Sequence, residues 1–258
     1  RSTGDKAMAG AAVAGPIGGG KTFIFEAVAS ELDVPVLVLK SIRSQWYGQT
    51  DVIFERLRRV LHALEKVVIF VDEADTQFGG IGAESHSTER RLTGKIQAMM
   101  SDPQLRGRVI WLLMTARIHL LSPDIRRPGR VGDLIIPVLD PQGKDREDFI
   151  RWVASSVLDS PSDEDLGKID GLTPGYSAAA FASLRSQLKA ADANSIDQVV
   201  EIVNDLILPA IGPTRRYQTL QALVNCTRRS LLPDEAAAEA NREEWRQEIR
   251  QLESQGIH

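Results

Sequence analysis

The sequence predicts an α/β fold, a parallel five-stranded sheet flanked by helices and followed by a small all-α helical lid domain. Three observations support this prediction. Short apolar runs alternate with segments of helical spacing up to residue 158. A glycine-rich loop ending in Lys-Thr joins the first run to the first helical segment. From residue 159 onward helical spacing dominates, with few β-branched runs.

Composition narrows the class of protein. The 258 residues are 43% hydrophobic, enough for a buried core, and carry a net charge of −4, which argues against nucleic-acid binding. Cys226 is the only cysteine, so no internal disulfide is expected, in keeping with the cytoplasm or another reducing soluble compartment. No apolar run is long enough to predict a membrane segment. The chain begins without a methionine and enters the first expected strand almost at once, as a fragment of a longer protein would, and the sequence alone does not decide whether it is one.

The first expected strand, residues 8–14, leads into a phosphate-binding loop at residues 15–22. The loop fits the pattern G-x-x-x-x-G-K-[ST], and helical spacing follows it over residues 23–32, which makes a merely flexible glycine turn the weaker interpretation. Backbone N–H groups and the helix dipole hold phosphates in such a loop. Lys21 supplies a cation, and the Thr22 hydroxyl a ligand for Mg²⁺. The predicted ATP/ADP-binding residues are Pro16, Ile17, Gly18, Gly19, Gly20, Lys21, Thr22 and Phe23.

The next elements are a strand and an aromatic segment. The continuous apolar run at residues 34–40 predicts a buried strand. Trp46, Tyr47 and Gly48 then precede an amphipathic helix expected at residues 51–65. From spacing alone, a core or helix-staple role is the favoured interpretation of the two aromatic side chains, over a functional role at this junction.

Two carboxylates follow the strand expected at residues 67–71. This strand should lie beside the first strand, and its carboxyl end would bring Asp72 and Glu73 to the bound phosphates. We therefore predict that Asp72 holds Mg²⁺ through water and that Glu73 takes the proton of the attacking water.

A glycine-rich loop at residues 77–86 and a helix at 87–100 lead to strands at 109–115 and 133–138. Between these last strands stand Arg126, Arg127 and Arg130. A solvated basic loop explains them, and so does an arginine finger that a neighbouring subunit presents to a phosphoryl transition state. Composition does not separate the two interpretations.

After Pro141 the sequence pattern changes from apolar strands alternating with helices to helical spacing. A helix at 144–157 precedes Ser-Pro-Ser at 160–162, so the predicted domains are 1–158, the phosphate-binding α/β domain, and 159–258, the helical lid with a C-terminal helix. The lid helices are expected at residues 163–169, 177–191, 195–208, 214–226 and 234–253. A thin stripe of Trp245, Ile249 and Leu252 on the last helix favours packing on the bundle over binding a partner.

Several motifs together resemble the AAA+ ATPases, and more narrowly the AAA group of protein-remodelling machines, over residues 8–232. The phosphate loop and Val-Asp-Glu-Ala-Asp at 71–75 are similar to the Walker pair. Residues 44–50 look like the family's pore-loop segment, residues 89–93 and 121–130 like its second homology region, and residues 175–179 like its lid motif.

The resemblance implies ATP hydrolysis in a homo-oligomeric ring, usually of six subunits, that threads a protein substrate through its pore. It implies that Arg127 and Arg130 act on a neighbour's ATP, that Gly175 and Ala178 lie near the adenine, and that Trp46, Tyr47 and Gly48 grip the substrate. Ala116 departs from the family, which usually has an asparagine there to orient the attacking water. The departure implies a slow ATPase, or one in which Thr115 or Arg117 substitutes.

Three functions remain in competition at this stage. The first is a Mg²⁺-ATP-hydrolysing ring that remodels, disassembles or threads a protein. The second is an ATP-binding assembly switch or scaffold with weak hydrolysis, motivated by Ala116. The third is a nucleic-acid loader, against which the acidic balance and the aromatic triplet count. The sequence alone identifies neither the substrate nor the size of the ring.

Overall fold

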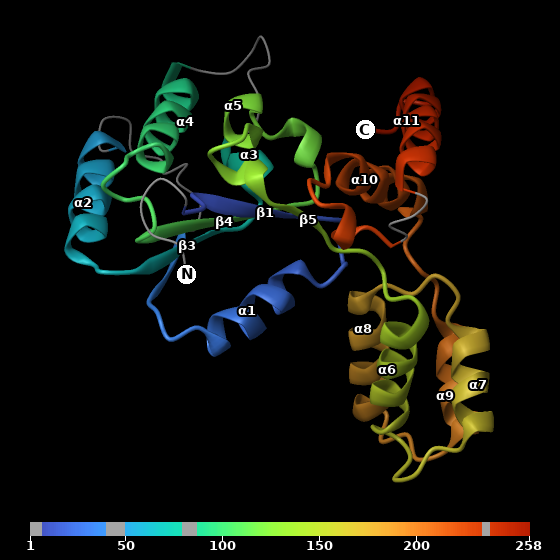
Figure 1. Cartoon of the computed structure of the whole chain (residues 1–258). Helices are drawn as coiled ribbons and strands as arrows, with labels where there is room; N and C mark the ends of the chain where they lie inside the picture. Colours follow the sequence, from blue (N-terminus) through green and yellow to red (C-terminus); the bar gives the residue numbers. More distant parts are fainter. Residues whose placement is uncertain (1–6, 40–49, 79–86, 234–237) are drawn as a thin grey trace.

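The computed structural model describes residues 7–39, 50–78, 87–233 and 238–258 (Figure 1). Its centre is a five-stranded parallel sheet in the order β2-β3-β4-β1-β5. The strands are β1 (Gly10–Ala14), β2 (Val36–Leu39), β3 (Val67–Val71), β4 (Val109–Thr115) and β5 (Ile135–Pro137). The expected five-stranded parallel sheet is confirmed.

Two details of the predicted sheet were wrong. β3 does not lie beside β1, because β4 is inserted between them and pairs with both. β2 is an edge strand that pairs only with β3 within the described sheet, and Val38 is 48% exposed, so this strand is not fully buried. A short apolar run at a sheet edge has the same sequence pattern as one in the interior.

The faces of the sheet carry different helices. α1 (Lys21–Glu31) lies on one face, where Phe25 stacks on Phe70 of β3. The helices α2 (Thr50–Ala63), α3 (Ala74–Phe78) and α4 (Ser87–Met100) lie on the other (Figure 1). Successive residues of a strand point to opposite faces of the sheet. Trp111 of β4 packs in the large core under α2 and α4, and Met114 of the same strand packs under α1.

A second hydrophobic core joins four helices. They are α6 (Gly143–Ala154), α7 (Asp163–Leu172), α8 (Ala178–Ala190) and α9 (Ile196–Asp205). Phe181, Leu184 and Leu188 of α8 are fully buried in this bundle. A capping box formed by Ser162 and Asp165 begins α7.

The chain then returns from the bundle to the sheet. α10 (Gly212–Asn225) contacts β5 and the 3-10 turn η2 (Ile118–Leu120), and α11 (Ala238–Ser254) packs on α10. Ile249 is buried there with Trp245 and Leu252 packed around it, so the apolar stripe of the last helix faces α10. The remaining short elements, α5 (Pro123–Arg126), η3 (Val131–Asp133) and η4 (Arg229–Leu231), were not predicted.

Candidate nucleotide site

The phosphate loop takes the shape that its glycines allow. β1 ends at Ala14, and a Cβ atom on Gly15 would lie 1.9 Å from the carbonyl oxygen of Val138. Gly18 and Gly20 have φ angles of 74° and 86°, a region that side chains disfavour. α1 begins at Lys21, the last residue but one of the loop motif, so its free N–H groups and dipole point toward the loop.

Lys21 is held by its own loop. Its Nζ donates to the carbonyl oxygens of Gly15 at 2.9 Å and Pro16 at 2.8 Å. Burial lowers the pKa of Lys21, and the nearby carboxylates of Asp72 and Asp75 oppose that shift. A partly buried ammonium group with only two carbonyl acceptors gains strongly from the negative oxygens of a phosphate chain.

The two carboxylates after β3 lie opposite the loop. Asp72 Oδ2 accepts from Thr22 Oγ1 at 3.5 Å, while Asp72 Oδ1 accepts from the backbone N of Glu73 at 2.8 Å. Glu73 has a φ of 47°, a strained conformation for a residue with a side chain. It is exposed and lines the same cavity as Lys21 and Thr22. The strain therefore sits at the residue predicted to be the general base.

The donor set at this position fits Mg²⁺ bound together with a nucleotide. Mg²⁺ takes one or two protein oxygens and fills its other positions with phosphate and water. Thr22 and Asp72 supply oxygens of that kind from adjacent positions. Among the residues that the structure describes, no group of three or more His, Cys, Asp or Glu side chains is placed to hold a metal by itself.

A buried network lies at the end of β4. Thr115 Oγ1 donates to Asp75 Oδ1 at 2.6 Å and accepts from the backbone N of Arg117. Arg117 Nε forms an ion pair with Asp75 Oδ2 at 2.7 Å, and Arg117 Nη2 donates to Thr76. Both hydrogen-bonding roles of the Thr115 hydroxyl are thus taken by protein groups. The side chain of Arg117 is 45% exposed and borders the cavity.

These parts line one cavity of about 700 Å³. The phosphate loop, the strand ends, α8 and α10 all contribute to its wall, which consists of Ile17, Gly18, Gly20, Lys21, Thr22, Phe23, Asp72, Glu73, Asp75, Thr76, Thr115, Ala116, Arg117, Ala179, Thr214, Gln218 and His258. Its volume is in the range of pockets that hold small ligands and cofactors. The structure therefore brings together the predicted phosphate, metal and general-base residues.

The lid motif contacts the phosphate loop through its backbone. Ala179 N donates to the carbonyl oxygen of Gly18 at 3.0 Å, and a Cβ atom on Gly20 would lie 3.3 Å from that of Ala178. Gly175, with a φ of 67°, forms the turn before α8 and does not line the cavity. The predicted pore-loop residues Trp46, Tyr47 and Gly48 lie outside the described residues.

Sequence reasoning missed the contribution of α10. Gln218 Oε1 accepts from Ile17 N at 2.9 Å, and Arg215 Nε donates to Ile17 O at 2.9 Å. Arg215 also pairs with Asp140. Gln218 follows Ile17 by 201 residues, so no local motif connects them. The burial of Gln218 is seen only in the structure, so the sequence offered no signal for this contact.

Replacing Gln218 should weaken nucleotide binding. Gln218→Leu leaves Ile17 N–H without its acceptor, which costs about 1–3 kcal/mol, and loosens the loop. We expect the Kd for ATP to rise about tenfold, measured by titration with a fluorescent ATP analogue. Gln221→Leu is the matched control, since Gln221 is also buried on α10 but donates to Tyr217. Equal affinity losses in the two variants would contradict a specific role for Gln218.

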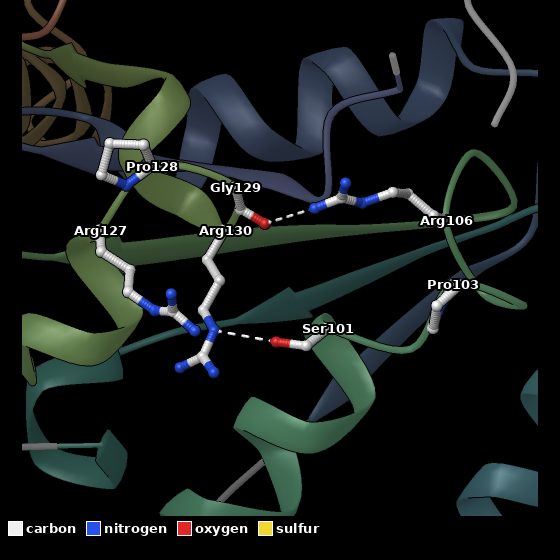
Figure 2. Close-up of a pocket in the computed structure, with 7 residues that line it drawn as sticks. All are labelled: Ser101, Pro103, Arg106, Arg127, Pro128, Gly129 and Arg130. Carbon is white, nitrogen blue, oxygen red and sulfur yellow. Dashed lines mark hydrogen bonds between the residues drawn. The ribbon is translucent and has the colours of Figure 1, made fainter. Parts of the chain in front are cut away.

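The arginine loop forms a separate pocket of about 230 Å³ (Figure 2). Arg127 is exposed, with a side chain 55% accessible and a 3.9 Å ion pair to Asp124. Arg130 is 8% exposed and donates to Ser101 Oγ and to the carbonyl oxygen of Asp124. Burial and the charge of Arg127 lower the pKa of Arg130. This pocket and the nucleotide cavity have no lining residue in common.

Comparison with known proteins identifies the class. Residues 11–137 match the family "ATPase family associated with various cellular activities (AAA)". Over 178 residues the chain is 30% identical to Protein SAV of Sulfolobus acidocaldarius, covering 67% of this chain and 22% of that protein. Over 206 residues it is 29% identical to the Cell division cycle protein 48 homolog of Archaeoglobus fulgidus, covering 74% and 27%. Over 230 residues it is 30% identical to the ATP-dependent zinc metalloprotease FtsH of Endomicrobium trichonymphae, covering 84% and 35%.

These findings assign the α/β part of the chain. Residues 11–137 are an AAA ATPase domain, a class of domain that binds and hydrolyses ATP. The chain spans about a fifth to a third of the length of these relatives. Within the described residues, no helix combines the length and the apolar character needed to cross a membrane.

Proposed function

We propose that this chain hydrolyses Mg²⁺-ATP at a site that a neighbouring copy completes. The copies form a ring of six subunits, and the energy of hydrolysis remodels a protein substrate. One observation carries the proposal. Arg127 and Arg130 line a pocket that has no residue in common with the nucleotide cavity of the same chain. An exposed arginine away from its own site is placed to serve the site of another subunit.

The residues of the cavity divide the chemistry among them. The loop N–H groups and Lys21 hold the phosphate chain, and Thr22 and Asp72 hold Mg²⁺, which neutralises charge on the phosphates. Glu73 faces the cavity from a fixed backbone position and accepts a proton from the attacking water. The Asp75 carboxylate accepts a hydrogen bond from Thr115 and pairs with Arg117, which fixes both side chains. Thr115 therefore acts by positioning. Arg117 adds positive charge beside the phosphates.

A second candidate function rests on Ala116. Ala116 borders the cavity, and its methyl side chain has no group that could hydrogen-bond to an attacking water. Such a site binds ATP and turns it over slowly, which suits an assembly switch. The presence of Arg117 in the same wall favours hydrolysis over the switch.

Ala116→Asn should distinguish these two functions. An added amide places one hydrogen bond on the water, worth about 1 kcal/mol or roughly a fivefold rise in kcat. Phosphate release under saturating ATP measures it, with Ala116→Val as the control that adds bulk without a polar group. A rise in kcat for Asn alone supports a competent site limited by water orientation. Unmeasurable turnover in both wild type and Ala116→Asn would favour the switch.

The protein-remodelling part of the proposal is tested through Tyr47. If Tyr47 grips an unfolded chain, a permanently unfolded protein such as carboxymethylated lactalbumin should stimulate wild-type ATP turnover. Tyr47→Ala should abolish that stimulation while leaving basal turnover intact, and Tyr47→Phe should retain it. Stimulation that survives in Tyr47→Ala would refute the grip. Salt-dependent stimulation by single-stranded DNA would instead favour the nucleic-acid loader.

We further propose how the chain is divided. The predicted boundary at residues 158 and 159 stays a prediction, and the packing supports a refinement of it. α6 shares its core with α7, α8 and α9, while α10 packs against β5. The lid is therefore best taken as α6 to α9, with α10 and α11 attached to the ATPase part. We place the protein in the cytoplasm or another reducing compartment, because its single thiol, Cys226, is buried and unbridged.

A further inference from the structure

The segment that carries Arg127 is a tight turn. Arg130 N donates to the carbonyl oxygen of Arg127 at 3.3 Å, Pro128 occupies the second position, and Gly129 has a φ of 83°. This is the pattern of a type II turn, which needs glycine at its third position. Arg127 and Arg130 are thus the two ends of one turn, and the orientation of the turn sets where both side chains project (Figure 2).

Arg106 holds that turn from outside. It lies in the connection between α4 and β4, and its Nη2 donates to the carbonyl oxygen of Gly129 at 2.8 Å. Figure 2 shows Arg106 reaching Gly129 from across the pocket, while Arg127 and Arg130 extend away from that contact. Asp133 Oδ1 accepts from Gly129 N at 3.0 Å. Both polar backbone groups of Gly129 are therefore fixed by side chains.

The other arginines of the segment are also tied to the domain. Arg130 is buried and donates hydrogen bonds to Ser101 Oγ and to the carbonyl oxygen of Asp124. Arg126 donates to the carbonyl oxygen of Leu121 and to Asn225 of α10. By contrast, the described contacts of Arg127 consist of one long ion pair to Asp124, and both of those side chains are more than half exposed. Arg127 is the arginine of this cluster that can extend to another molecule.

From this arrangement we infer that Arg106 is a positioning residue for hydrolysis in trans: it locks the turn through Gly129 so that Arg127 projects into the neighbour's nucleotide site. The inference rests on the proposed function. It assigns different roles to the two predicted finger residues, with Arg127 reaching the neighbour's phosphates and Arg130 serving as the buried base of the turn. Arg106 does not line the nucleotide cavity of its own chain.

The first test is a double-mutant cycle. Arg106→Met removes the hydrogen bond and keeps an unbranched apolar stem in place of the lower part of the arginine side chain. We expect kcat to fall ten- to a hundredfold, because small misplacements of a catalytic group cost that much. The Kd for ATP in the same protein should be unchanged. Arg106→Lys keeps a donor and should restore most of the rate. In an Arg127→Ala background, Arg106→Met should add no further loss, since it acts only through Arg127.

Arg108→Met is the matched control. Arg108 lies in the same connection and also clamps backbone carbonyl oxygens, but those of His62 and Leu64 at the end of α2. Both arginine-to-methionine variants lose hydrogen bonds to backbone carbonyl oxygens. Their melting temperatures therefore show how much stability each loses, separately from the effect on kcat. A kcat loss of equal size in Arg108→Met, or an added loss from Arg106→Met on top of Arg127→Ala, would overturn the inference.

The second test asks where the defect acts. Assemblies of two subunit types are isolated with two affinity tags, one subunit carrying Glu73→Gln and the other Arg106→Met. The first has an intact Arg127 and the second an intact Glu73, so mixed assemblies should turn over ATP faster than the sum of the two separate preparations. A parallel experiment mixes Glu73→Gln subunits with Arg127→Ala subunits. If ATP turnover in these mixed assemblies does not exceed the sum of the separate preparations, the shared site itself is rejected. If turnover recovers when Glu73→Gln is mixed with Arg127→Ala but not when it is mixed with Arg106→Met, only the role of Arg106 is rejected.

Discussion

Arg127→Ala should lower ATP turnover about a thousandfold, the low end of what an arginine finger contributes to phosphoryl transfer. The affinity for ATP should stay within a factor of about two, because Arg127 does not line the nucleotide cavity of its own chain. Stability should also be unaffected, since the only described partner of Arg127 is Asp124 in an exposed pair, worth at most about 1 kcal/mol.

Arg246→Ala is a close control for Arg127→Ala. Arg246 is 51% exposed and pairs with Glu243 three residues earlier, as Arg127 pairs with Asp124. Its loss should change neither turnover nor melting temperature. Arg127→Lys should recover little activity, because an ammonium group lacks the planar fork of a guanidinium. Wild-type turnover in Arg127→Ala would rule out the arginine as part of the catalytic site.

Glu73→Gln should lower kcat by about a hundred- to ten-thousandfold, the range that a positioned general base contributes. Glutamine keeps the shape and the backbone conformation at φ 47° but does not accept a proton. ATP should therefore still bind, with a Kd close to wild type. Single-turnover hydrolysis and equilibrium binding on the same protein separate the two effects.

Two further variants serve as controls for Glu73→Gln. Glu26→Gln changes an exposed carboxylate on α1 that does not line the cavity, and should leave kcat unchanged. Asp72→Asn should instead raise the Mg²⁺ concentration needed for half-maximal turnover, since Asp72 lies beside Thr22 at the metal position. Substantial hydrolysis in Glu73→Gln would mean that another group takes the proton.

Local patterns in the sequence predicted the phosphate loop and the strand ends well. The bounds of β4 and α4 agree with expectation, and Lys21, Thr22, Asp72 and Glu73 meet in one cavity. The reason is physical: glycines with positive φ, a helix start and the carboxyl ends of parallel strands each impose constraints within a few residues.

What the sequence did not predict depends on distant contacts. The order of strands in the sheet is set by packing, so β4 between β1 and β3 leaves no local trace. Gln218 and Arg215 reach the loop through the return of α10 to the sheet, about two hundred residues away. The contrast between Arg127 and Arg130 is one of burial, which three arginines in a short loop do not reveal.

The most direct test of the central claim is ATP turnover measured against protein concentration, with the size of the particles followed by light scattering in the same samples. If a neighbour's Arg127 completes each site, specific activity should rise with concentration as monomers assemble, and level off once assembly is complete. In Arg127→Ala, assembly should occur without that rise. Constant, measurable specific activity in a preparation shown to be monomeric would contradict the claim.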